Sequence, residues 1–116
     1  MHEYSIVSSL IDRVEAEVKK NGATSVGSLT VQIGEISGVD SRLLAIAFDT
    51  FRERTCCANA ELKIENVPAT WKCPKCGTPP VAGGPLRCFP CNQPAELVAG
   101  DEIILAHLEL EVPDHV

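Results

Sequence analysis

The sequence 73-CPKCGTPPVAGGPLRCFPC-91 contains two Cys-x-x-Cys pairs, Cys73/Cys76 and Cys88/Cys91, with eleven residues between them. Thiolates from two such turns converge on one point and form a tetrahedral four-sulfur site, which suits zinc or, less often, iron. Four thiolates leave no open coordination position, so the pattern predicts a structural zinc rather than a catalytic one. The alternative is a pair of disulfides in a small secreted module, which a reducing compartment would disfavour.

The sequence around these cysteines is too rich in proline and glycine to form a core of its own. Residues 68–94 hold seven of the eight prolines, together with Gly77, Gly83 and Gly84. That density excludes a helix or a long strand. Because such a segment buries little apolar surface, we expect the bound metal to supply its order.

Strands are predicted on both sides of this segment. Apolar and polar residues alternate over 61–67, and Pro68 ends the run. After Gly100, residues 102–112 alternate over a longer run, and we expect one face of this strand to carry Ile104, Ala106, Leu108, Leu110 and Val112. Alone this strand could bury nothing, so it belongs with elements earlier in the chain.

The first sixty residues supply those elements. Apolar residues at three- and four-residue steps predict a helix over 3–20, which Asn21-Gly22 ends. Residues 26–36 alternate as a strand. A second helix should begin at Asp40 or Ser41, both good N-caps, with an apolar stripe of Leu43, Leu44, Ala47, Phe48 and Phe51.

These elements predict an α+β fold: a three-stranded sheet with two helices on one face, plus an inserted zinc-ribbon-like module. We expect a discontinuous α+β domain, residues 1–67 and 98–116, and a zinc-binding domain, residues 68–97. A chain of 116 residues with 45% hydrophobic content is long enough for one modest core.

Charge and composition exclude several classes of partner. The formal net charge is −6, which argues against nucleic acid because a phosphate backbone needs a basic surface. The sequence has no run of about 18 apolar residues, so no membrane partner is expected. The first residues lack a cationic stretch followed by an apolar one, so we expect no export signal and a cytoplasmic protein with Cys56 and Cys57 reduced.

No set of catalytic side chains stands out, so the sequence predicts a protein that is not an enzyme. Residues 34–38, Gly-Glu-Ile-Ser-Gly, fit neither a dinucleotide-binding nor a Walker loop. Cys56 and Cys57 are adjacent and poorly placed to share a tetrahedral metal, so they are interpreted as small apolar residues near a helix end. His107 is interpreted as a polar residue on the outer face of the last strand.

His2 lies next to the α-amine of Met1, where fused chelate rings can form on one metal. The amine, the His2 amide and the imidazole are three nitrogen donors, and the Glu3 amide is a fourth. Four near-coplanar nitrogens suit square-planar Ni(II) or Cu(II). The amine and imidazole must lose protons, from pKa values of about 8 and 6.5, so metal should be released on acidification. From this residue alone, a histidine at position 2 is more often an accident of sequence.

Together these motifs resemble the HypA/HybF family of nickel metallochaperones for hydrogenase maturation. The resemblance extends nearly end to end and rests on Met1-His2-Glu3-Tyr4-Ser5, Ile33-Gly34-Glu35-Ile36-Ser37-Gly38-Val39-Asp40, Phe48-Asp49, the two Cys-x-x-Cys pairs and Gly100-Asp101-Glu102. The spacer between the cysteine pairs departs from the family because it is short and rich in proline and glycine. Family contacts of that loop are therefore not carried over.

The resemblance implies two metals and two protein partners. Transferable Ni(II) would bind at Met1, His2 and Glu3, with Asp40 only as a residue outside the first coordination sphere, and structural Zn(II) would bind at Cys73, Cys76, Cys88 and Cys91. The implied partners are a HypB-type GTPase and the precursor of the NiFe-hydrogenase large subunit. Urease accessory proteins are an open alternative, and the sequence is compatible with a monomer and with a homodimer.

Two other functions compete with that of a nickel carrier. Residues 73–77, Cys-Pro-Lys-Cys-Gly, resemble one knuckle of rubredoxin, so a rubredoxin-like electron carrier would hold iron and be red. The other rival is a zinc-ribbon interaction module that acts on nucleic acid or the transcription machinery, which the acidic balance disfavours.

Overall fold

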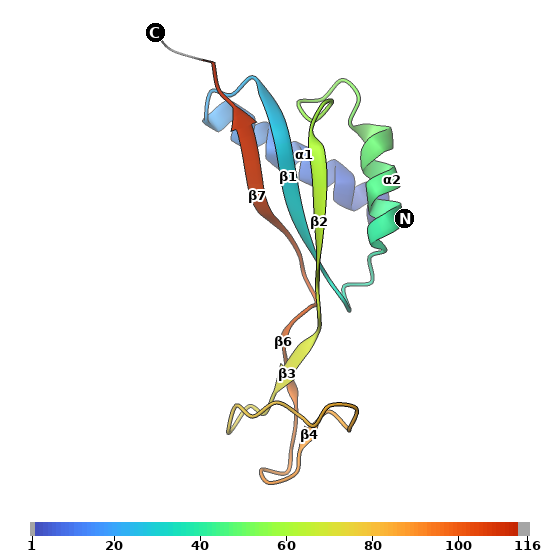
Figure 1. Ribbon diagram of the computed structural model, residues 1–116, viewed down its shortest axis with the longest axis vertical. Helices are drawn as coiled ribbons and strands as arrows, with labels where there is room; N and C mark the ends of the chain where they lie inside the picture. The colour runs from blue at the N-terminus through green and yellow to red at the C-terminus, as the bar shows by residue number, and fades with distance from the viewer. Residues whose placement is uncertain (1, 114–116) are drawn as a thin grey trace.

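The computed structural model describes residues 2–113 and shows an elongated molecule in two parts (Figure 1). Its radius of gyration is 18.6 Å, whereas a compact chain of this length has about 13 Å. One part, called here the α+β part, carries both helices and a three-stranded sheet; the other, the ribbon (residues 70–99), carries the paired cysteines. The elements are α1 (His2–Lys20), β1 (Ser25–Gly34), α2 (Ser41–Phe51), β2 (Glu61–Val67), β3 (Thr70–Lys72), β4 (Arg87–Cys88), β5 (Gln93–Pro94), β6 (Glu96–Ala99) and β7 (Ile103–Glu111).

The three long strands form one mixed sheet in the order β2-β1-β7. β1 and β2 run parallel because α2 carries the chain back between them, whereas β1 and β7 are antiparallel. Both helices pack on one face of this sheet, and the predicted fold class is confirmed (Figure 1). The limits of the two predicted domains stay a prediction.

The hydrophobic core lies between the sheet and the two helices. Full burial of an aliphatic or aromatic side chain here stabilises the fold by about 1.5–3 kcal/mol. The ring of Tyr4 lies edge-on to that of Phe51 at 5.2 Å, which joins the first turn of α1 to the last turn of α2. The buried residues come mainly from α1, β1 and α2 and include Val7, Leu10, Ile11, Val14, Val26, Leu29, Val31, Ile33, Leu44, Ala47 and Phe48.

α2 begins at its N-cap Asp40, as predicted, but its buried stripe is narrower than predicted. The Asp40 carboxylate accepts hydrogen bonds from the Arg42 and Leu43 amides at 2.9 and 3.2 Å. Leu43 and Phe51 were expected in the buried stripe and are 49% and 44% exposed. Only one side of α2 faces the core, and it carries Leu44, Ala47 and Phe48.

β7 contains a bulge that breaks its alternation. His107 and Leu105 pair with adjacent residues of β1, so Ala106 is an extra residue on β7. The predicted face is therefore wrong for Ile104 and Ala106, which are exposed, and Val112 is exposed beyond the end of the strand. On β7 the residues that pack on the core are odd-numbered before the bulge and even-numbered after it: Ile103, Leu105, Leu108 and Leu110.

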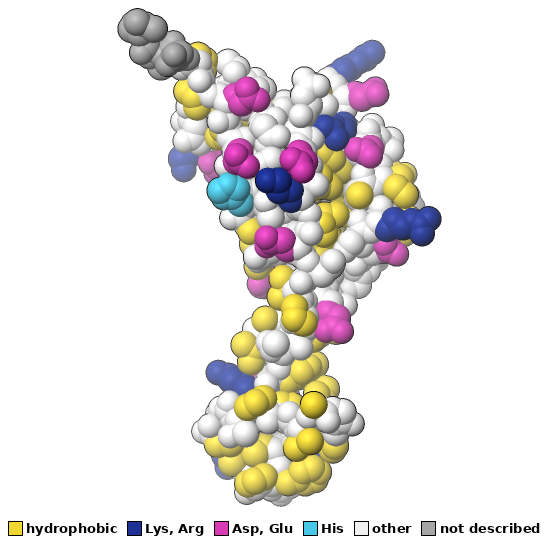
Figure 2. Space-filling model, viewed as in Figure 1, with side chains coloured by type: hydrophobic (Ala, Val, Ile, Leu, Met, Phe, Trp, Pro, Cys, Tyr) yellow, Lys and Arg dark blue, Asp and Glu magenta, His cyan; other side chains and the backbone are white. Residues whose placement is uncertain are grey.

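The ribbon consists of two small antiparallel pairs, β3-β6 and β4-β5. Figure 2 shows hydrophobic side chains over much of its surface, while charged side chains lie mainly over the α+β part. Val81 and Phe89 are 76% and 68% exposed. Across residues 2–113, neither helix is long and apolar enough to span a bilayer.

Candidate metal centre

The first cysteine turn follows directly from β3. The Gly77 amide donates to the Cys73 carbonyl at 2.9 Å, and Gly77 has a φ of +75°, a conformation that glycine adopts without strain. The amides of Lys75 and Cys76 point at Cys73 Sγ, at 3.4 and 3.5 Å. Backbone N–H groups aimed at a sulfur stabilise its thiolate form, which is the form that binds metal.

The second turn lies between β4 and β5. Its Asn92 amide donates to the Phe89 carbonyl at 3.1 Å, and Asn92 has a φ of +50°. The Arg87 guanidinium donates to Asn92 Oδ1 at 2.7 Å and to its carbonyl oxygen at 3.2 Å. Arg87 thus braces this turn through both bonds to Asn92.

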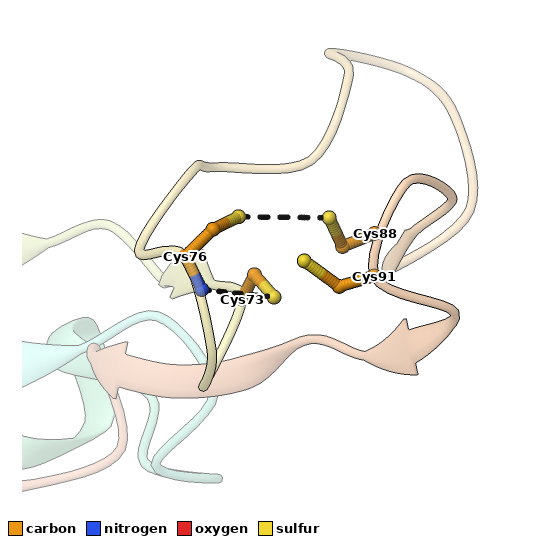
Figure 3. A group of neighbouring side chains, drawn as sticks. All are labelled: Cys73, Cys76, Cys88 and Cys91. Carbon is orange, nitrogen blue, oxygen red and sulfur yellow. Dashed lines mark hydrogen bonds between the residues drawn. The ribbon is translucent and has the colours of Figure 1, made fainter.

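The two turns bring all four predicted cysteines together. Their Sγ atoms lie within 4.8 Å of one another, and Cys76 Sγ is 3.7 Å from Cys88 Sγ. Figure 3 shows the four side chains pointing toward a common centre. Tetrahedral zinc with sulfur ligands at about 2.3 Å needs sulfurs about 3.8 Å apart, so this four-cysteine site is suited to structural zinc. None of the four is in a disulfide.

The four thiols differ in acidity because their hydrogen-bond partners differ. A hydrogen bond with Thr78, whose Oγ1 lies 3.3 Å from Cys76 Sγ, lowers the pKa of Cys76 to about 6. Backbone amides lower the pKa of Cys73, with the Cys76 amide first. Contact with Cys76 raises the pKa of Cys91 to about 12. Sequence reasoning missed the role of Thr78, although a hydroxyl two residues after a ligand is a usable signal.

The predicted nickel residues are only partly described by the structure. Met1 and the side chain of His2 lie outside the described residues, as does His115, while the His2 backbone begins α1. Glu3 Oε2 lies 3.5 Å from the Asp40 amide nitrogen, which donates to it. The structure thus brings Glu3 and Asp40 together across 37 positions of sequence.

Comparison with known proteins matches residues 1–110 to the family model described as "Hydrogenase/urease nickel incorporation, metallochaperone, hypA". The chain belongs to the HypA family. It is 41% identical to the hydrogenase maturation factor HypA of Wolinella succinogenes, over 98% of both chains. The HypA protein of Aquifex aeolicus is 39% identical, over 97% of this chain and 99% of that one.

Solved HypA structures share the fold. The solution structure of the nickel metallochaperone HypA from Helicobacter pylori matches with a TM-score of 0.75 and 36% identity, covering 96% of this chain and 98% of that one. A second solution structure of a HypA protein gives a TM-score of 0.79 at 37% identity, covering 97% and 98%. Membership of the HypA family over nearly the whole chain favours a metallochaperone over a rubredoxin-like carrier or a nucleic-acid-binding ribbon.

Proposed function

We propose that this HypA-family chain is a nickel metallochaperone that binds Ni(II) at Met1, His2 and Glu3 and delivers it, with a GTPase partner, to the hydrogenase large-subunit precursor. The observation that carries the proposal is the family match over residues 1–110, which includes both the N-terminus and the four-cysteine site. The GTPase and the precursor are the partners that the family resemblance implies. Delivery to urease is a second destination compatible with the family description.

The chemistry of the chain's first residues supports an N-terminal site. An α-amine, an imidazole and two backbone amides together provide nitrogen donors for square-planar Ni(II). The first amides of a helix have no intrahelical acceptor. Because α1 begins at His2, metal can replace the amide protons of His2 and Glu3 without breaking a hydrogen bond of the helix.

Asp40 supports the site from outside the ligands. Its carboxylate is already engaged as the N-cap of α2, where it accepts from two amides. Its own amide donates to the Glu3 carboxylate. We therefore assign Asp40 to holding the Glu3 side chain in place rather than to binding nickel.

The proposal assigns no catalysis to this chain. The four-cysteine site offers four protein ligands and no open position, so its metal holds structure. The chain would bind, hand over and release nickel, with the α+β domain (1–67 and 98–116) as the nickel-binding unit and residues 68–97 as the zinc-binding unit. A cytoplasmic location accords with the absence of disulfides among its six cysteines, all of which are described.

A titration of tag-free, zinc-loaded protein with Ni(II) tests the proposal. His2→Ala should abolish high-affinity binding, since it removes the imidazole donor, and so should an N-terminal extension that buries the amine in a peptide bond. His107→Ala is the matched control, because His107 is exposed on β7, far along the chain from the N-terminus. Zinc content should stay unchanged in all variants. Wild-type nickel affinity in both altered proteins would refute the N-terminal site.

A further inference from the structure

Two linkers, residues 68–69 and 100–102, join the ribbon to the α+β part (Figure 1). The backbones of the two linkers are in contact. A Cβ atom added to Gly100 would lie 2.5 Å from Ala69 Cα, and Gly100 has a φ of +104°. Only glycine combines that conformation with so close an approach. The linkers therefore meet at a defined crossing instead of acting as two independent tethers.

The end of β1 binds both linkers at this crossing. Gly34 donates its amide to the Glu102 carbonyl of the returning linker at 2.9 Å. Ile36 donates to the Gly100 carbonyl of the same linker at 2.8 Å. Between them, Glu35 donates its amide to the carbonyl of Val67, the last residue of β2, also at 2.8 Å. Three consecutive amides thus hold the returning linker and the residue of β2 from which the outgoing linker starts.

The Glu35 side chain adds a bond that reaches further toward the ribbon. Its Oε1 accepts a hydrogen bond from the Ala69 amide at 2.7 Å. Ala69 precedes β3, whose first residue Thr70 already pairs with Ala99 of β6. Hydrogen bonds to an ionised carboxylate are about twice as strong as bonds between neutral groups. Through its side chain, Glu35 therefore binds the outgoing linker two residues closer to the ribbon than its own amide does at Val67.

The same loop continues from the crossing to the N-terminal end. Four residues after Ile36, Asp40 caps α2 and donates its amide to Glu3. A single segment of seven residues, 34–40, thus touches both linkers at one end and Glu3 at the other. This segment therefore connects the orientation of the ribbon with the position of Glu3.

We propose that Glu35 is a positioning residue, whose bond to the Ala69 amide holds the ribbon in one orientation relative to the N-terminal metal site. The inference rests on the proposed function for the identity of that site. The hydrogen bond from the Ala69 amide to the Glu35 carboxylate, called here the clamp, is observed at the crossing. Two rigidly joined parts present one composite surface, so a partner can engage both without ordering them first. Loss of the clamp leaves both parts folded and the backbone bonds of the crossing in place, and it widens the range of orientations that the two parts adopt.

The test compares zinc-loaded wild type with Glu35→Ala and Glu35→Gln. Glu61→Ala is the control, since Glu61 is an exposed glutamate at the start of β2. Backbone amide relaxation measures how fast each part tumbles, and spin labels on the ribbon and α2 measure the spread of the distance between them. In Glu35→Ala the ribbon should tumble faster than the α+β part, and the distance distribution should broaden.

Glu35→Gln keeps a side-chain carbonyl oxygen as acceptor but makes a weaker, neutral hydrogen bond, so its tumbling and distance distribution should lie between those of wild type and Glu35→Ala. Equal tumbling of both parts in Glu35→Ala would overturn the clamp. Hydrogenase maturation in cells should fall in Glu35→Ala and recover in part in Glu35→Gln, with Ni(II) affinity unchanged in both. Full maturation by a Glu35→Ala protein with a mobile ribbon would overturn the positioning role. If wild-type protein failed to bind nickel at its N-terminus, the proposed function would fail while the relaxation result would still decide the clamp.

Discussion

Cys57 shows how the surroundings of one side chain determine its chemistry. It is fully buried in the core, and its Sγ lies 3.9 Å from that of Cys56. Burial raises the pKa of Cys57 to about 12, and the nearby Cys56 and Glu15 act in the same direction. Burial also raises the pKa of Cys56. Both thiols are therefore protonated at neutral pH, and Cys57 packs as a small apolar residue.

Cys57 should make the free energy of unfolding decrease at alkaline pH. Its pKa is about 12 in the fold against 9.0 for an ordinary thiol, so its stabilising effect is complete below about pH 9 and is lost as pH rises toward 12. Cys57→Ala should lack this loss, although its cavity costs about 1 kcal/mol at neutral pH. Urea denaturation of both proteins between about pH 7 and pH 10 measures the difference. If the free energy of unfolding depended on pH in the same way in both proteins, the raised pKa of Cys57 would be contradicted.

At the scale of the elements, β7 shows the limit of sequence periodicity. Alternation predicts which residues share a face only while the pairing register is continuous. The register with β1 shifts twice, where Gly27 is the extra residue of β1 and where Ala106 is the extra residue of β7. Each bulge exchanges the two faces of its strand. The boundaries of β7 could be predicted from its composition, but its bulge depends on a partner strand about 75 residues earlier.

The glycines at the linker crossing should tolerate alanine less well than a glycine in an open turn. Gly22 has a φ of +63° and open space around it, so Gly22→Ala should cost about 1–2 kcal/mol from conformation alone. Gly100→Ala adds a clash with Ala69, and a Cβ on Gly34 would lie 2.2 Å from the Gly100 carbonyl oxygen. Both changes should lower the free energy of unfolding by more than Gly22→Ala does, as measured by urea denaturation. Three equal effects would show that the crossing is not tightly packed.

At the scale of the whole molecule, the two parts are held together by different forces. The α+β part has a core of apolar side chains from five elements. Within residues 68–99, the buried side chains are those of Cys73 and Cys88, both of which belong to the four-cysteine site. The ribbon therefore has no apolar core to replace the metal, and its order depends on the four thiolates and the ion between them.

Removal of zinc should unfold the ribbon and leave the α+β part folded. Structural zinc sites contribute roughly 10–16 kcal/mol of apparent binding energy, more than the short strands β3 to β6 could supply. Either a strong chelator or Cys88→Ser should abolish protection of ribbon amides in hydrogen exchange, while amides of β1 stay protected. Cys56→Ser is the control cysteine, because Cys56 lies outside the four-cysteine site. Protected ribbon amides in zinc-free protein would contradict this dependence.

The sequence by itself determined the features that arise from neighbouring residues. Periodicity placed both helices and all three long strands, and the strand ends it predicted lie within two residues of those observed. The short Asp40 side chain marked the start of α2, and cysteine spacing identified all four members of the metal site. These features are local, since a turn, a cap and an amphipathic face each depend on a few adjacent side chains.

Only the tertiary structure decided how those pieces meet. The strand order, the bulge at Ala106, the linker crossing at Gly100 and the bond from Glu35 to Ala69 join residues far apart in the chain. No local pattern predicts such pairings, because the glutamate and the amide that it binds are each ordinary within their own segments. These long-range contacts stabilise the protein only after the chain has folded and brought the two linkers past the end of β1.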